Sequence, residues 1–126
     1  MAYGLAGEHL RPVAAGMRLA GTAVTLRLSA VPGARSYHEG ARRQFALGRS
    51  VPGAVMVIRN EVAGFDTVGA FDAHLARASG YVGYLCDGPV RDTDALRELG
   101  LPVFATGVRA DCIRLSDLPS GSSIGF

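Results

Sequence analysis

A strand, a tight turn and a helix follow one another in the stretch YVGYLCDGPVRDTDALREL, residues 81–99. The apolar run Tyr81–Leu85 predicts a buried strand, and the pattern of Asp94–Leu99 predicts a short helix that stops at Gly100 and Pro102. Between them lie the eight residues Cys86-Asp87-Gly88-Pro89-Val90-Arg91-Asp92-Thr93. A turn of this kind lies at the carboxyl end of a strand, where open α/β sheets bind small ligands.

Arg91 and Asp92 are the candidate functional residues of this turn. A guanidinium can bind a carboxylate through two parallel hydrogen bonds, and a neighbouring carboxylate can bind a hard divalent cation. Asp is also a preferred first residue of a helix, so Asp92 can instead cap the following helix while Arg91 pairs with it at the surface. Spacing alone leaves both interpretations open.

The pattern around this turn predicts a small parallel βαβαβ core in an α/β fold. The expected strands are Ala54–Ile58, Tyr81–Cys86 and Leu101–Ala105, and the expected helices are one that is capped by Thr67 and ends at Ala78 and one over Asp94–Leu99. Strands that alternate with helices form a parallel sheet with right-handed crossovers. The loops Arg59–Thr67 and Asp87–Asp92 should therefore lie at the same edge of the sheet.

The remaining elements are less regular. Leu19–Leu28 alternates as a strand does, and Ser36–Leu47 predicts a helix with Ser36 as its cap and Glu39 at the third helical position. Two shorter elements are also expected, a helix within Glu8–Ala15 and a strand at Ile113–Leu115. Thr67 is expected to cap the helix that ends at Ala78 and to leave one apolar face made of Phe71, Leu75 and Ala78.

A second candidate site lies in the stretch DTVGAF, residues 66–71. The free backbone amides at the start of a helix attract anions, and Gly69 would let a ligand approach the backbone closely. The alternative is an ordinary capped helix with a glycine in its first turn. The three histidines lack the spacing of a zinc site, and Cys86 is expected to be a buried thiol.

Composition restricts the class of protein. The chain has 126 residues, 48% of them hydrophobic, and a net charge of +2, so we expect one domain over residues 1–126 with no nucleic-acid partner. No apolar run is long enough to span a membrane, and the N-terminus does not resemble a signal peptide. Two cysteines predict no disulfide framework, and we expect a cytoplasmic location.

Several blocks of sequence resemble one family. They are residues 80–92, GYVGYLCDGPVRD; residues 96–105, LRELGLPVFA; residues 19–25, LAGTAVT; and residues 52–58, PGAVMVI, with Gly69 at the family's distance before Arg91. In this order they resemble the regulator of ribonuclease activity A (RraA) family, which includes 4-hydroxy-4-methyl-2-oxoglutarate aldolases and oxaloacetate decarboxylases. The resemblance covers about residues 11–107. It implies a swivelling β/β/α fold and a homotrimer or a hexamer built from two trimers.

The same resemblance implies a site. Asp92 would bind Mg²⁺ or Mn²⁺, Arg91 would be the catalytic residue that contacts a short keto acid, and the backbone at Gly69, Ala70 and Phe71 would bind the substrate carboxylate. The metal would stabilise the negative charge of a pyruvate enolate during carbon–carbon cleavage.

Some positions depart from the family pattern. Ala70 and Ala95 stand where the aldolases usually carry acidic residues, and Arg59-Asn60 stands where many relatives have an acid. Relatives usually have a further helix at the start and a strand-rich segment at the end, so we expect this chain to be shortened at both ends. Two functions follow as hypotheses: a metal-dependent lyase acting on a keto acid, or a non-catalytic protein partner that regulates ribonuclease E.

Overall fold

The computed structural model of the chain describes residues 9–32, 37–110 and 122–125. Helices and strands alternate through most of this part. In chain order the elements are β1 (Arg11–Pro12), β2 (Thr22–Pro32), α1 (Tyr37–Ser50), β3 (Ala54–Asn60), α2 (Ala70–Ala78), β4 (Tyr81–Val90), α3 (Thr93–Leu99), β5 (Val103–Val108) and β6 (Ser122–Gly125).

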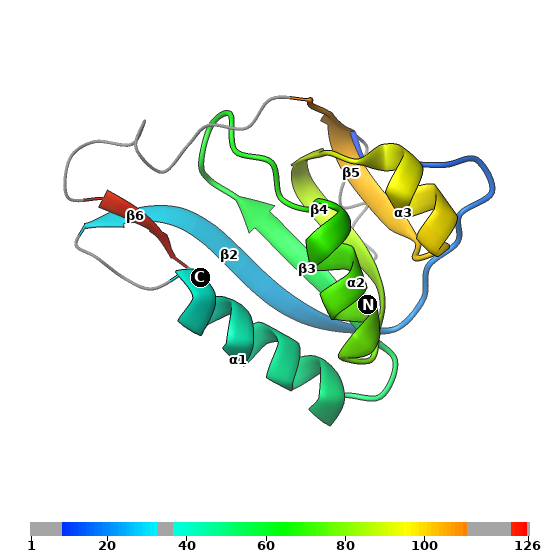
Figure 1. Ribbon diagram of the computed structural model, residues 1–126, viewed down its shortest axis with the longest axis horizontal. Helices are drawn as coiled ribbons and strands as arrows, with labels where there is room; N and C mark the ends of the chain where they lie inside the picture. The colour runs from blue at the N-terminus through cyan, green and yellow to red at the C-terminus, as the bar shows by residue number, and fades with distance from the viewer. Residues whose placement is uncertain (1–8, 33–36, 111–121, 126) are drawn as a thin grey trace, which may run out of the picture.

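The strands form a six-stranded sheet in the order β1-β5-β4-β3-β2-β6 (Figure 1). The four central strands are parallel, and the two short edge strands β1 and β6 are antiparallel to their neighbours. One row of the register runs from Val24 through Met56 and Tyr84 to Val103. The predicted parallel βαβαβ core is confirmed, and β2 and α1 add a further unit of the same kind in front of it.

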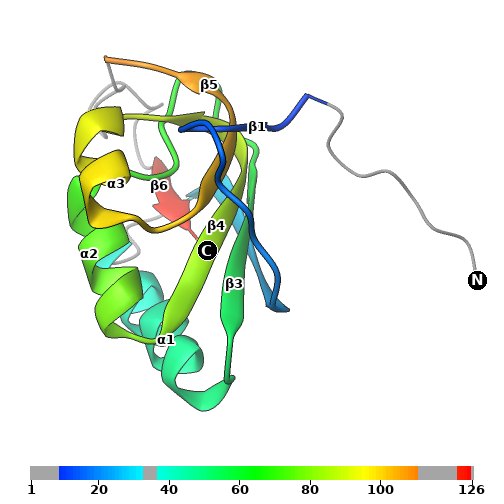
Figure 2. The same ribbon diagram turned by 90° about the vertical axis from the view of Figure 1, so that its right-hand side faces the viewer.

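All three helices cover the same face of the sheet (Figure 2). This follows from right-handed crossovers that step along the sheet in one direction, from β2 to β5. The segment before β2 crosses the opposite face, where Leu19 contacts the backbone at Gly83. The largest fully buried side chains are Tyr84, Leu28, Leu96, Val68, Val90, Val103 and Cys86. No helix in the described ranges is both long and apolar enough to cross a membrane.

The helix expected within Glu8–Ala15 is wrong for the described residues from His9 onward. They form a turn and the short strand β1, and the backbone N–H of Val13 donates to the carbonyl of Val103. Pro12 lacks an N–H group and is better tolerated at a sheet edge than inside a helix. Pairing with β5 therefore decides the conformation of this segment.

Helix α2 begins at Ala70, with Gly69 rather than Thr67 at its cap position, and its apolar face was predicted wrongly. Thr67 does not cap the helix, because its hydroxyl donates to the carbonyl of Pro89. Ala73 and Ala76 face the core, while Phe71 is 73% exposed. Small side chains on the inner face let the helix axis approach β4 closely, and this arrangement turns the larger apolar residues outward.

The ends of other elements also differ from the prediction. β4 continues through Val90, so the loop expected at Asp87–Asp92 is reduced to Arg91 and Asp92. The strand expected at residues 19–28 begins at Thr22 and extends to Pro32, and β6 was not predicted. The predicted cap Ser36 and the predicted strand Ile113–Leu115 lie outside the described residues.

Candidate functional site

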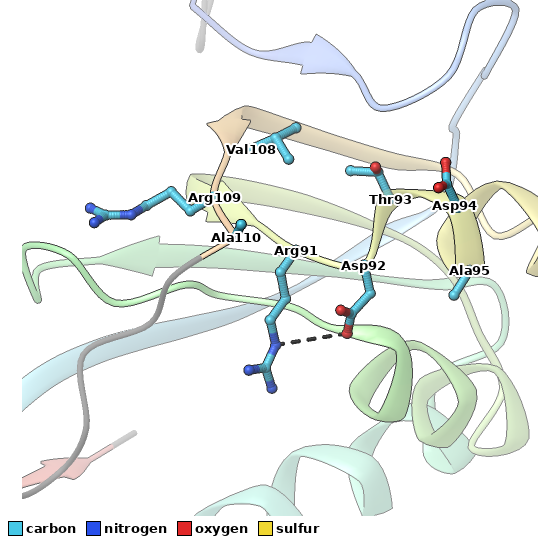
Figure 3. Close-up of a pocket in the computed structure, with 8 residues that line it drawn as sticks. All are labelled: Arg91, Asp92, Thr93, Asp94, Ala95, Val108, Arg109 and Ala110. Atoms are coloured by element: carbon cyan, nitrogen blue, oxygen red, sulfur yellow. Dashed lines mark ion pairs between the residues drawn. The ribbon is translucent and has the colours of Figure 1, made fainter.

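The end of β4 presents Arg91 and Asp92 toward the first turn of α2. Figure 3 shows both side chains extending to the same side of the chain. Asp92 precedes α3 and has a left-handed backbone, with φ 55° and ψ 41°. It is the one non-glycine residue with positive φ among the described residues. Such a backbone costs about 1–3 kcal/mol, and residues of this kind cluster at functional sites.

The carboxylate of Asp92 contacts the start of α2 rather than α3. Its Oδ2 accepts a hydrogen bond of 2.9 Å from the backbone N–H of Ala70 and lies 3.8 Å from Nε of Arg91. Asp92 occupies the cap position of α3, but its side chain makes no capping hydrogen bond. Capping of α3 therefore does not account for an aspartate at this position.

Arg91 makes its shorter ion pair with Asp66, to which the sequence analysis gave no role although it lies in the candidate stretch 66–71. Nε of Arg91 lies 3.0 Å from Oδ2 of Asp66, and the Asp66 side chain is only 5% exposed. The signal available in the sequence was an acidic residue just before a predicted helix, which is also the ordinary pattern of a helix start. Only the position of β4 beside this loop shows that Asp66 faces Arg91.

Hydrogen bonds to the end of β4 hold the loop that carries Asp66. The backbone N–H and the hydroxyl of Thr67 both donate to the carbonyl of Pro89, over 2.8 and 2.9 Å. The N–H of Arg91 in turn donates to the carbonyl of Val68 over 3.0 Å. The two segments, 66–68 and 89–91, therefore act as one rigid unit.

Gly69 lies directly against both side chains of the candidate pair. A Cβ atom added to Gly69 would lie 2.7 Å from Nε of Arg91 and 2.9 Å from Oδ2 of Asp92. The N–H of Gly69 donates to Oδ2 of Asp72 over 3.2 Å. The structure thus brings together Gly69, Ala70, Arg91 and Asp92, whereas the exposed side chain of Phe71 turns away from the core.

An open hollow of about 340 Å³ lies beside this pair, at the carboxyl ends of β4 and β5. Its lining residues are those drawn in Figure 3: Arg91, Asp92, Thr93, Asp94, Ala95, Val108, Arg109 and Ala110. The hollow, Arg91 and Asp92 therefore lie at the edge of the sheet to which the sequence assigned the candidate site.

Comparison with known proteins places this geometry in a family. A family model described as RraA-like, Aldolase/RraA, matches residues 2–117. The chain belongs to the RraA-like family. The sequence has no significant match among curated proteins.

Solved structures share the fold of this RraA-like chain. The RNA-processing inhibitor RraA from Thermus thermophilus is 22% identical with a TM-score of 0.59, and the match covers 93% of this chain and 65% of that one. Streptomyces coelicolor RraAS2, described as an unusual member of the RNase ES inhibitor RraA family, is 23% identical with a TM-score of 0.58, over 83% and 48% of the two chains.

A structure described as novel cellulases from microbes of the gut ecosystem has a TM-score of 0.70 at 17% identity, over 82% and 46%. The chain thus spans about half to two thirds of the length of these proteins. At these identities the likeness shows the fold alone, which is the mixed α/β fold of RraA-like proteins.

The charges around Arg91 are mostly negative. Asp66 and Asp92 contact its guanidinium, and Asp72 lies close enough for the positive charge to act on it. Burial raises the pKa of Asp72 above its usual 3.8; the Gly69 N–H and Arg91 oppose this effect, and Asp66 adds to it. Below the site, complete burial raises the pKa of the Cys86 thiol to about 12. Cys86 is thus the buried thiol that the sequence predicted.

The carboxylate of Asp92 could serve as a single protein ligand of a divalent cation. Within the described ranges no group of three or more His, Cys, Asp or Glu side chains could hold a metal. Mg²⁺ commonly binds through one or two carboxylates and completes its shell with water and substrate oxygens. Asp92 can supply one such carboxylate, because its contacts with described residues all use Oδ2. Asp94 lines the hollow but pairs with Arg97 at 2.6 Å, and Asp72 binds the N–H of Gly69.

Proposed function

We propose that this RraA-like chain carries a lyase site for a short keto acid that depends on a divalent metal. The class is that of 4-hydroxy-4-methyl-2-oxoglutarate aldolases or oxaloacetate decarboxylases. One observation carries the proposal: the guanidinium of Arg91, the carboxylate of Asp92 and the first amide of α2 converge on Gly69. A cation site, a carboxylate-binding fork and backbone donors are the groups that a keto acid requires.

Each residue has a role that suits its surroundings. Arg91 is the catalytic residue that binds and orients the keto acid through charge-assisted hydrogen bonds. The backbone at Gly69, Ala70 and Phe71 would bind the substrate carboxylate, which would replace the carboxylates of Asp72 and Asp92 to which the Gly69 and Ala70 N–H groups now donate. Asp92 would hold Mg²⁺ or Mn²⁺. When bound, this metal supplies positive charge that offsets the negative charge developing on the substrate.

The charge balance also favours a cation. Two carboxylates, Asp66 and Asp92, face one guanidinium in the ion pairs of the site. The hollow itself is lined by two acids, Asp92 and Asp94, and two arginines, Arg91 and Arg109, so its lining carries no net charge to attract an anionic keto acid. A divalent cation next to Asp92 would make the hollow positive and favour substrate binding.

The test is release of pyruvate from oxaloacetate and from 4-hydroxy-4-methyl-2-oxoglutarate, with Mg²⁺ or Mn²⁺ and with a chelator. Asp92→Asn should abolish the metal-dependent rate, with a loss above the ~100-fold typical of residues that only support a metal ligand. Asp94→Asn is the matched control, because Asp94 lines the same hollow but pairs with Arg97. Full activity of Asp92→Asn would refute the proposal.

A second candidate is a non-catalytic role as a protein partner that regulates ribonuclease E. Ala70 and Ala95 favour it because they leave the metal without supporting acids, and the exposed Phe71 favours it because the ring offers apolar surface. In this case calorimetry should detect no heat with Mg²⁺ and millimolar pyruvate, while the chain inhibits ribonuclease E in a cleavage assay. Phe71→Ala should weaken that inhibition.

For either role we propose a homotrimer or a hexamer, and light scattering can measure the mass of this assembly.

A further inference from the structure

We infer that Asp66 is a positioning residue of the keto-acid site: it holds the Nε edge of Arg91 from the buried side, so that the two terminal nitrogens face the ligand. The inference rests on the proposed function and adds a residue to which neither the sequence motifs nor the family resemblance gives a role. The edge of the guanidinium that remains available for ligand binding is then the one formed by Nη1 and Nη2.

The contacts of Arg91 divide its guanidinium into two parts. Both of its ion pairs, 3.0 Å to Asp66 and 3.8 Å to Asp92, are made by Nε. In both pairs Nε is the guanidinium nitrogen nearest to the carboxylate, and among the described residues only Asp66 and Asp92 pair with this guanidinium. Because the Arg91 side chain is 46% exposed, these two nitrogens remain accessible and can donate two parallel hydrogen bonds to a carboxylate.

Asp66 is well suited to hold this orientation. The residue is 6% exposed, and the loop after it is joined to the end of β4 by hydrogen bonds from Thr67 and from the backbone of Arg91. The carboxylate therefore cannot follow the guanidinium if the latter swings toward solvent. Arg91 is a long side chain at the surface, and a fixed buried partner removes much of its rotational freedom before a ligand arrives.

Burial of the Asp66 carboxylate costs folding free energy that a purely structural residue would not need to cost. Oδ1 of Asp66 is buried and has no hydrogen-bond partner among the described residues. A buried carboxylate with one satisfied oxygen is destabilising compared with an apolar side chain of similar size. An aspartate here thus favours a role in controlling Arg91 over a role in packing.

The decisive experiment compares oxalate binding by calorimetry, in the presence of Mg²⁺, between the wild type and Asp66→Asn. Oxalate is the probe because it has the carboxylate and the adjacent oxygen of a keto acid. If Asp66 orients Arg91, the dissociation constant for oxalate should rise about tenfold in Asp66→Asn. In the pyruvate-release assay with oxaloacetate, the same variant should raise KM more than it lowers kcat. If Asp66 only neutralises Arg91, the variant should bind oxalate more tightly, and this result would overturn the inference.

Two further variants separate positioning from general damage. Asp87→Asn is the matched control, because Asp87 lies on β4, the strand that leads to Arg91, but pairs with His9 at the surface. The oxalate affinity of this variant should equal that of the wild type. In an Arg91→Lys background, which lacks the Nε edge, Asp66→Asn should have no further effect. A further tenfold loss in that background would overturn the inference.

A readout that needs no ligand is the Arg91 Nε–H signal in a proton–nitrogen spectrum, assigned by its loss in Arg91→Lys. It should exchange slowly with solvent in the wild type and quickly in Asp66→Asn. Fast exchange in the wild type would overturn the inference. A wild-type chain that binds no oxalate would refute the proposed function and with it the positioning role, whereas normal binding by Asp66→Asn would refute the positioning role alone.

Discussion

Replacing Gly69 by alanine tests the site with a single methyl group. The added Cβ would lie 2.7 Å from Nε of Arg91 and 2.9 Å from Oδ2 of Asp92, so these atoms must retreat by about 0.5–0.7 Å to reach an ordinary contact of 3.4 Å. Both neighbours are side-chain ends rather than backbone, and the φ of −121° at Gly69 suits alanine. The fold should therefore survive while the site is displaced.

The expected cost differs between stability and activity. A retreat of this size would stretch the 2.9 Å bond from the Ala70 N–H to Asp92 to its limit. A hydrogen bond to a charged group contributes about 1.5–3 kcal/mol, but Asp92 is half exposed, so we expect a loss of about 1 kcal/mol in the free energy of unfolding. Misplacement of catalytic groups by somewhat less than 1 Å can reduce a rate by ~100-fold.

Two measurements on the same preparation check this reasoning. Denaturant unfolding gives the change in stability, and metal-dependent pyruvate release gives the change in rate. Gly107→Ala is the matched control, because a Cβ there meets nothing within 4 Å, and it should change neither quantity. Full lyase activity in Gly69→Ala would refute the idea that Arg91 and Asp92 act from their observed positions.

Two further predictions follow from the titrating groups. Because burial raises the pKa of Cys86 to about 12, iodoacetamide at pH 8 should leave this thiol unmodified in the folded chain and should alkylate it in the chain unfolded by guanidinium. Peptide mass spectrometry can measure both reactions, and equal alkylation rates in the two states would contradict the burial of Cys86. The unfolded thiol ionises near 9.0, so Cys86 should contribute to a fall in stability as the pH rises above that value. Burial also raises the pKa of Asp72 above 3.8, so its favourable contribution exists below pH 3.8 and is lost as the pH rises through the folded pKa. Asp72→Asn should therefore unfold at a higher denaturant concentration than the wild type at pH 7 but not at pH 3, and a less stable variant at pH 7 would contradict this.

The strands and helices that the sequence predicted well are those with a strong local signal. Ala54–Ile58 and Tyr81–Cys86 are apolar runs bounded by glycine or proline, and Gly100 ends α3 in the left-handed conformation expected of a helix end. Segments whose conformation depends on a distant partner were predicted poorly. Arg11 and Pro12 pair with β5, about 90 positions away, and no local pattern could show that pairing.

The face of α2 failed for a related reason. The helical repeat predicts one apolar face made of Phe71, Leu75 and Ala78, whereas Ala73 and Ala76 contact the core. Periodicity identifies a helix and its possible faces. Which face is buried depends on how closely the helix can approach the sheet. Where the approach is close, the face with small residues is the one that is buried.

The sequence by itself determined the parallel core, the family and the pair Arg91 and Asp92 at a strand end, because each depends on residues that are neighbours along the chain. Only the tertiary structure decided that Asp66 holds Arg91 and that Asp92 binds the first amide of α2. These contacts join residues more than twenty positions apart. They exist because parallel strands bring the loops after β3 and β4 to the same edge of the sheet.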